Sequence, residues 1–309
     1  MSHSMGVLMS RSVSTAAQRP FPSLRAFAAR RPVSAFCVAA VGLVLLLQTL
    51  LLVAGLDLTP GKLAELVILF GLALLLTAWI GGVPLVRRLL GGLARWRFGL
   101  GRWLLVLLAM PALTVAVGLA TGTFRTSPDG WGAVTLDYLV ILVLIALTAS
   151  IWEETAWAGF VQSRLMADRG LLIGSLLTAA PFALIHLPLA FESSGLARTS
   201  LTDAWISWAF VIGSAPFFRY LAGGLLVDTG GSILAVALLH ASFNTSGSLS
   251  VVPGGWQYAL ALVVLTILVA AYRALRGRSL VRGTVPALAE PGSESLSRSG
   301  QAGDQRAAA

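Results

Sequence analysis

Long apolar runs, separated by charged or turn-forming residues, dominate the chain. A membrane-spanning helix needs about 20 predominantly apolar residues. Runs without Asp, Glu, Lys or Arg cover residues 33–56, 66–86, 103–124, 170–191, 204–218 and 229–272. The last run, at 44 residues, is long enough for two helices. The Ser, Gly and Pro residues that follow Asn244 mark the break between them.

One further apolar run is interrupted by two adjacent carboxylates. Residues 138–152 are apolar, Glu153 and Glu154 follow, and the first basic residue after them is Arg164. We predict one long helix over about residues 136–168, with both carboxylates near its middle. The pattern therefore predicts an all-α integral membrane protein with about eight transmembrane helices. We expect a flexible basic tail at 1–32, a membrane core at 33–273 and a disordered tail at 274–309.

Composition and charge agree with a membrane protein. Hydrophobic residues make up 57% and charged residues 11% of the chain, whereas soluble domains have about 25% charged residues. This excludes an ordinary soluble globular protein. With both termini in the cytoplasm, 19 of the 22 Lys and Arg residues, Arg219 among them, fall on the inner side. The positive-inside rule predicts this orientation and accounts for the net charge of +9, so no nucleic-acid partner is needed.

A few polar side chains fall inside the predicted spans. An ionisable group at mid-bilayer costs about 2.5–3.5 kcal/mol, so such residues are functional candidates. The candidates are Glu153, Glu154, His186, His240 and Asn244. The fourth and fifth spans meet at a turn near Gly170. Glu154 and His186 each lie about 23 Å from that turn at 1.5 Å per residue, so we expect them at the same depth.

The same residues form three spaced motifs: Glu153-Glu154, Phe182-Ala-Leu-Ile-His186 and His240-Ala-Ser-Phe-Asn244. In this order they resemble the CPBP (Abi) family of intramembrane proteases, which includes the type II CAAX prenyl proteases and bacteriocin-processing relatives. The resemblance implies an eight-helix core and a peptide or protein substrate, lipidated or membrane-embedded, with no cofactor. It implies that Glu153 is the general base for water and that His186 holds that water. His240 and Asn244 would stabilise the oxyanion, and Glu154 would orient a partner.

One position departs from the family pattern, EExxxR. Alanine stands at position 158, where the family has arginine. Arg164 lies about 15 Å further along the helix than Glu154 and is too far away to replace it. Arg219, from the sixth span, is a candidate replacement that the sequence alone does not decide.

Two other interpretations remain open at this point. Glutamate and histidine side chains also ligate zinc, so the same site could belong to a metalloprotease. The alanine at position 158 leaves open a non-catalytic alternative, either a peptide-binding or immunity scaffold or a small transporter. Arginine far outnumbers lysine, which is typical of a GC-rich prokaryotic gene and predicts a plasma-membrane location.

Overall fold

The computed structural model describes residues 27, 28 and 30–285. Every regular element in this part of the chain is helical, which confirms the predicted all-α class. The α-helices are α2 (Pro32–Val53), α3 (Thr59–Gly91), α4 (Leu100–Ala120), α5 (Gly130–Ile145), α6 (Ile151–Glu154), α7 (Ser163–Ile185), α8 (Leu201–Asp228), α9 (Ile233–Ser246) and α10 (Gln257–Leu275). Two π-helical segments, η1 (Ala146–Ser150) and η2 (Thr155–Gln162), and one 3-10 helix, η3 (Leu187–Phe191), complete the set.

Six helices in the described residues are long and apolar enough to cross a membrane. One of them is the helical run Gly130–Phe191, which contains the predicted fourth and fifth spans. Its backbone leaves helical geometry at Gly170, where φ is 77°. A Cβ atom on Gly174 would lie 2.7 Å from the backbone nitrogen of Met166, so the two parts pack tightly beside this turn. The predicted seventh span corresponds to α9, which has only 14 residues, and the total of eight spans stays a prediction.

The predicted end of the sixth span is wrong. We expected this span to cover residues 204–218 and Arg219 to lie among the charges of the inner side. Instead α8 continues to Asp228, and Arg219 is completely buried within it. A helix can carry this cation in its interior because a buried carboxylate compensates it, as described below.

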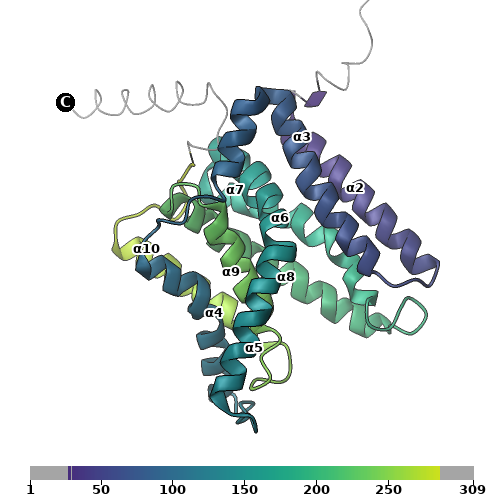
Figure 1. Ribbon diagram of the computed structural model, residues 1–309, viewed down its shortest axis with the longest axis vertical. Helices are drawn as coiled ribbons and strands as arrows, with labels where there is room; N and C mark the ends of the chain where they lie inside the picture. Colours follow the sequence, from purple (N-terminus) through teal and green to yellow (C-terminus); the bar gives the residue numbers. More distant parts are fainter. Residues whose placement is uncertain (1–26, 29, 286–309) are drawn as a thin grey trace, which may run out of the picture.

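The glutamate-bearing segment lies in the middle of the bundle (Figure 1). Helices α2 and α3 pair on one flank, and α4 packs with α10 on the other. Between them, η2 and α7 pack against each other, and α7 packs along α8. Buried aromatic side chains fill the space around this centre: Phe36, Trp157, Phe160, Phe182 and Phe218.

The chain that follows α10 packs back on the bundle as far as residue 285. The carbonyl of Val281 accepts a hydrogen bond from the backbone N–H of Leu172 at 3.2 Å. The hydroxyl of Tyr220 donates to the carbonyl of Leu280 at 3.2 Å, and Val285 is buried. The first residues of the predicted tail 274–309 therefore contact α7 and α8. The rest of that tail, like most of the tail 1–32, lies outside the described residues.

Candidate active site

Two π-helical segments flank the four residues of α6 that carry the adjacent glutamates. A π-helical turn inserts one extra residue per turn, which re-aims the side chains next to it, and such turns are frequent at functional sites. Here the neighbouring glutamates differ in their surroundings. The side chain of Glu154 is fully buried, whereas that of Glu153 is 12% exposed. The two carboxylates can therefore do different work.

Glu154 forms a buried, two-pronged ion pair with Arg219. The Nη1 atom of Arg219 lies 3.0 Å from Oε2 of Glu154, and Nη2 lies 2.5 Å from Oε1. Both side chains have zero exposure. Parallel N–H···O bonds of this kind fix the orientation of the carboxylate as well as compensating its charge. Arg219 thus supplies, from α8, the cation that Ala158 cannot supply from the same helix.

Aromatic rings and one amide hold Arg219 in place. Its guanidinium lies 4.2 Å from the ring centre of Phe182 and 4.7 Å from that of Phe218. Cations over aromatic faces are stabilised electrostatically. The amide of Gln162 donates to the carbonyl of Arg219 at 2.6 Å and to the hydroxyl of Ser175 at 3.0 Å. Side chains from η2, α7 and α8 therefore fix the position of this cation.

His240 is bound to the same carboxylate. Its Nδ1 lies 2.7 Å from Oε1 of Glu154, and its side chain is only 5% exposed. An ionised carboxylate paired with a guanidinium is an acceptor only, so the proton of this hydrogen bond resides on Nδ1. Nε2 of His240 is then the ring nitrogen left for a ligand, and it donates a hydrogen bond only when the imidazole is doubly protonated.

His186 sits at the end of α7, where its backbone forms the carboxyl-terminal cap. Its Nδ1 lies 2.7 Å from the carbonyl oxygen of Phe182 and therefore donates to it. In the neutral imidazole this leaves Nε2 as an acceptor. Phe182 lies between the two histidines, with ring centres 4.6 Å from His186 and 6.0 Å from His240. Glu153 is close enough for its charge to act on His186.

Glu153 is not held as Glu154 is. Its Oε2 atom is buried and has no hydrogen-bond partner, and it lies 3.9 Å from Nδ1 of His240. Asn244 follows His240 by one turn of α9, its side chain is exposed, and the structure gives it no hydrogen bond. The structure thus gathers Glu153, Glu154, His186 and His240, while Asn244 stands one helical turn away from them.

Two charged residues near the site were not predicted to belong to it. Arg219 was named only as a candidate, and Glu65 was missed. Arg219 was placed at a helix end because it is the first charge after an apolar run. The apolar residues 220–227 that follow it were the signal that the helix continues. Glu65 lies one residue before the predicted second span. It is buried in α3, accepts a hydrogen bond from the amide of Gln48 at 2.8 Å, and is within electrostatic range of Glu153.

The described residues contain no group of three or more His, Cys, Asp or Glu side chains arranged to hold a metal ion. The donor set at Glu154 also fits zinc poorly. Both of its oxygens face the guanidinium of Arg219, and one of them also accepts from His240. A divalent cation at this carboxylate would have to displace an existing cation.

Comparison with known proteins agrees with the three motifs. Residues 135–246 match the family model described as type II CAAX prenyl endopeptidase Rce1-like. The matched segment extends from α5 to the end of α9, so it contains both glutamates, both histidines, Arg219 and Asn244. No curated protein and no solved structure matches the chain. Residues 135–246 are thus similar to an Rce1-like type II CAAX prenyl endopeptidase domain, in agreement with the family that the three motifs resemble.

Proposed function

We propose that this protein is a metal-independent intramembrane endopeptidase in which Glu153 activates water for attack on a peptide bond. One observation carries the proposal: of two adjacent glutamates, Glu154 is fixed by Arg219 and His240, while Glu153 keeps a buried oxygen without a partner. A fixed carboxylate can orient its neighbours. An unpaired one, close to two histidines, is suited to accept a proton.

In the proposed reaction, Glu153 takes a proton from a water molecule while the water oxygen attacks the carbonyl carbon of the substrate. Nε2 of His186, the free acceptor of that ring, holds the second proton of the water. When the tetrahedral intermediate collapses, the C–N bond breaks and Glu153 passes its proton to the departing amine. The sum is the addition of one water molecule across one peptide bond.

The negative oxygen of the intermediate needs hydrogen-bond donors. We assign this role to Nε2 of His240 and the side-chain amide of Asn244, which share one face of α9. Because Nδ1 of His240 already donates to Glu154, Nε2 can donate only when both ring nitrogens carry a proton, as in an imidazolium. The Glu154 carboxylate holds the ring in position through this hydrogen bond. Glu154 is therefore a positioning residue in this scheme.

The substrate we propose is a membrane-embedded or lipidated peptide or protein. The matched family model is named for endopeptidases of prenylated CAAX proteins, and the apolar surroundings of the site are compatible with a substrate delivered from the bilayer. We place the protein in the plasma membrane as a multi-pass protein, with its site level with the membrane interior. The arginine distribution follows membrane topology, so we propose no nucleic-acid partner.

The test is Glu153→Gln, which keeps the size of the side chain and removes the base. Membrane and secreted peptides are compared by mass spectrometry in cells that express the wild type, E153Q or E192Q at equal levels. Glu192 is a matched control, because it is a loop carboxylate that is 40% exposed and paired with Lys62 of α3. We expect E153Q to lose peptide products that both the wild type and E192Q release.

Two results would overturn the proposal. If E153Q releases the same peptides and keeps full biological function, the proposal that Glu153 drives proteolysis is wrong. If the activity of purified protein is lost with a strong chelator and restored by zinc, the water is activated by a metal and not by Glu153 alone.

A further inference from the structure

A cavity lies outside the candidate active site. It has a volume of about 620 Å³ and is bordered by α4, α8, α9 and α10. Its lining includes neither Glu153, nor His186, nor Asn244. Cavities of about 300–1,000 Å³ are of the size that holds small-molecule ligands. Nothing in the proposed proteolytic mechanism uses this space.

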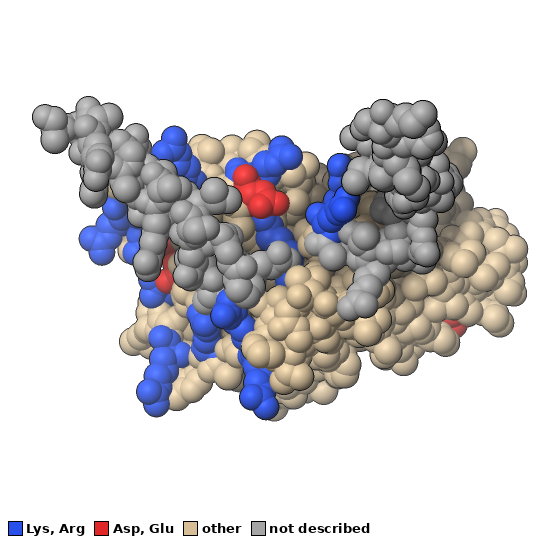
Figure 2. Space-filling view, turned by 90° about the horizontal axis from the view of Figure 1, so that it is seen from above, with Lys and Arg blue, Asp and Glu red and all other residues tan. Residues whose placement is uncertain are grey.

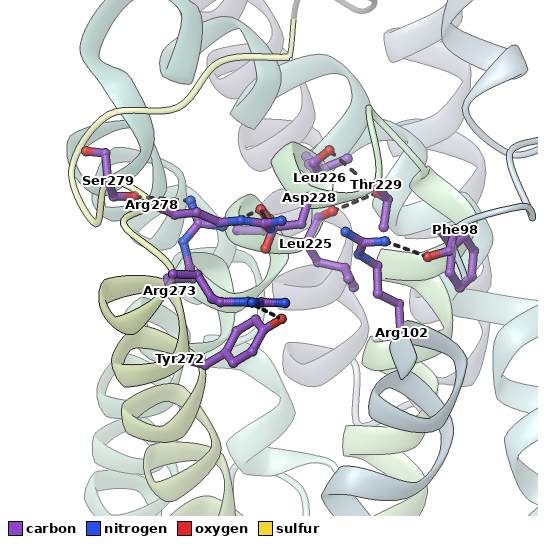
Figure 3. A network of polar contacts seen from close by, with 12 residues as sticks. Phe98, Arg102, Leu225, Leu226, Asp228, Thr229, Tyr272, Arg273, Arg278 and Ser279 are labelled. Carbon is purple, nitrogen blue, oxygen red and sulfur yellow. Dashed lines mark hydrogen bonds and ion pairs between the residues drawn. The ribbon is translucent and has the colours of Figure 1, made fainter. Parts of the chain in front are cut away.

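The rim of the cavity is rich in arginine. Arg102 at the start of α4 and Arg276 and Arg278 just after α10 line it, together with one carboxylate, Asp228. Figure 3 shows Arg102 on one side, Arg273 and Arg278 on the other, and Asp228 between them.

Asp228 does not neutralise this rim. Its Oδ1 is already 2.6 Å from Arg273 and 2.8 Å from Arg278. Arg102 donates only to a neutral carbonyl, that of Phe98, at 2.7 Å. Among the described residues, neither Arg102 nor Arg276 forms an ion pair with a carboxylate. The rim therefore carries an excess of positive charge.

Two further features strengthen the attraction for an anion. The cavity mouth includes Gly99 and Gly101, at the amino-terminal end of the 21-residue helix α4, where the backbone N–H groups give a partial positive charge. The face of the molecule seen in Figure 2 carries many basic side chains and few acidic ones. The positive-inside rule places such an arginine-rich side toward the cytoplasmic leaflet.

The interior of the cavity is apolar. Each of the four helices contributes aliphatic side chains, for example Leu105, Leu225, Leu239 and Leu265. Leu268 and Tyr272 also line the cavity and are about half exposed, so it opens to the outside along α10. A free inorganic anion could use the arginine rim but gains nothing from an aliphatic interior. A ligand that matches both parts has an anionic head and a hydrocarbon chain.

We infer that this cavity is a binding site for one anionic phospholipid of the inner leaflet. Its phosphate lies between Arg102 and Arg276, and one acyl chain enters the aliphatic interior. Basic pockets between transmembrane helices on the cytoplasmic side are a recurrent site for anionic lipids. A bound lipid contacts α8 and α9 together, through Leu225 and Leu239. The inference does not depend on proteolytic activity.

The test counts bound lipid on the purified full-length protein by native mass spectrometry. The probes are phosphatidylglycerol, phosphatidylcholine with the same acyl chains, and inorganic phosphate. We expect one retained phosphatidylglycerol per chain, and binding about 30-fold weaker in R102Q/R276Q, from the usual contribution of a basic side chain near anionic lipid. The double variant R125Q/R198Q, which removes two arginines outside this cavity, is expected to bind like the wild type.

A steric variant covers the case in which R102Q/R276Q folds poorly. A Cβ atom on Gly101 meets nothing within 4 Å, so a side chain there starts in open space, and G101L adds bulk at the mouth without changing charge. We expect it to weaken phosphatidylglycerol binding without lowering the unfolding midpoint of the lipid-free protein, because leucine favours a helix more than glycine does. Equal retention of phosphatidylcholine, equal loss in both double variants, unchanged binding in G101L, or displacement of the lipid by millimolar phosphate would each overturn the inference.

Discussion

Replacing Arg219 is the sharpest test of how the candidate site is held together. The substitution Arg219→Gln removes both N–H···O bonds to Glu154 and the contacts with the rings of Phe182 and Phe218. The glutamine leaves Glu154 fully buried with His240 as its remaining polar contact. The change therefore strands a charge inside the bundle, where water cannot solvate it.

The expected cost is large for a single substitution. Breaking a buried ion pair by removing one partner destabilises a protein by about 3–5 kcal/mol. Each cation–aromatic contact that is also lost contributes about 0.5–2 kcal/mol, which favours the upper part of that range. By contrast, Lys62→Gln removes an ion pair with Glu192 in which both side chains are 40% exposed. Such exposed pairs are worth about 0–1 kcal/mol.

Equilibrium unfolding in mixed micelles measures these differences, and a double-mutant cycle isolates the pair. We expect R219Q and E154Q each to lose about 3–5 kcal/mol, because each leaves one buried charge without its partner. E154Q/R219Q should lose clearly less than the sum, with a coupling of about 3 kcal/mol. If R219Q is no less stable than K62Q, or if the two single losses simply add, Arg219 does not hold Glu154 in the folded protein.

Three further predictions follow from the same geometry. Gly223→Val should destabilise by about 1–3 kcal/mol, because its Cβ would lie 2.6 Å from Nε2 of Gln162. Gly213→Val, on the same helix with nothing within 4 Å, is the control in the same unfolding assay. Asn244→Ala should lower kcat by about 10²–10³ with little change in KM, as for the loss of one oxyanion donor, and an unchanged kcat would remove Asn244 from the site. Purified protein should keep its activity in a strong chelator, and a loss that zinc reverses would contradict the metal-free scheme.

Much of the fold was predictable because a bilayer leaves few choices. Backbone polar groups in lipid must be satisfied within helices, so each long apolar run predicts a helix directly. The prediction failed where a charge lies inside a helix. Arg219 ended the sixth span in the sequence interpretation, because an isolated cation is costly in hydrocarbon. Its compensation by Glu154, 65 positions away along the chain, is a tertiary contact that hydropathy cannot reveal.

The sequence predicted which residues form the candidate site better than it predicted the hydrogen bonds between them. Rarity of polar groups within the spans identified Glu153, Glu154, His186 and His240, and the structure gathers all four. Glu154 is fixed and Glu153 keeps an oxygen without a hydrogen-bond partner. This difference depends on the π-helical turns around α6 and on hydrogen bonds from α8 and α9. The buried hydrogen bond between Gln48 and Glu65 was not predicted, because Glu65 lies just outside an apolar run.

The cation that pairs with Glu154 comes from α8, and not from position 158 of the same helix as in the family motif. An arginine at position 158 would reach Glu154 within one helix, whatever the rest of the bundle does. Arg219 reaches the same carboxylate from α8, and its guanidinium also lies against Phe182 of α7. The carboxylate is therefore oriented only when α6, α7 and α8 are packed together. Ala158 is itself fully buried, so Ala158→Arg would force a second cation into filled space and should destabilise the protein rather than restore the motif.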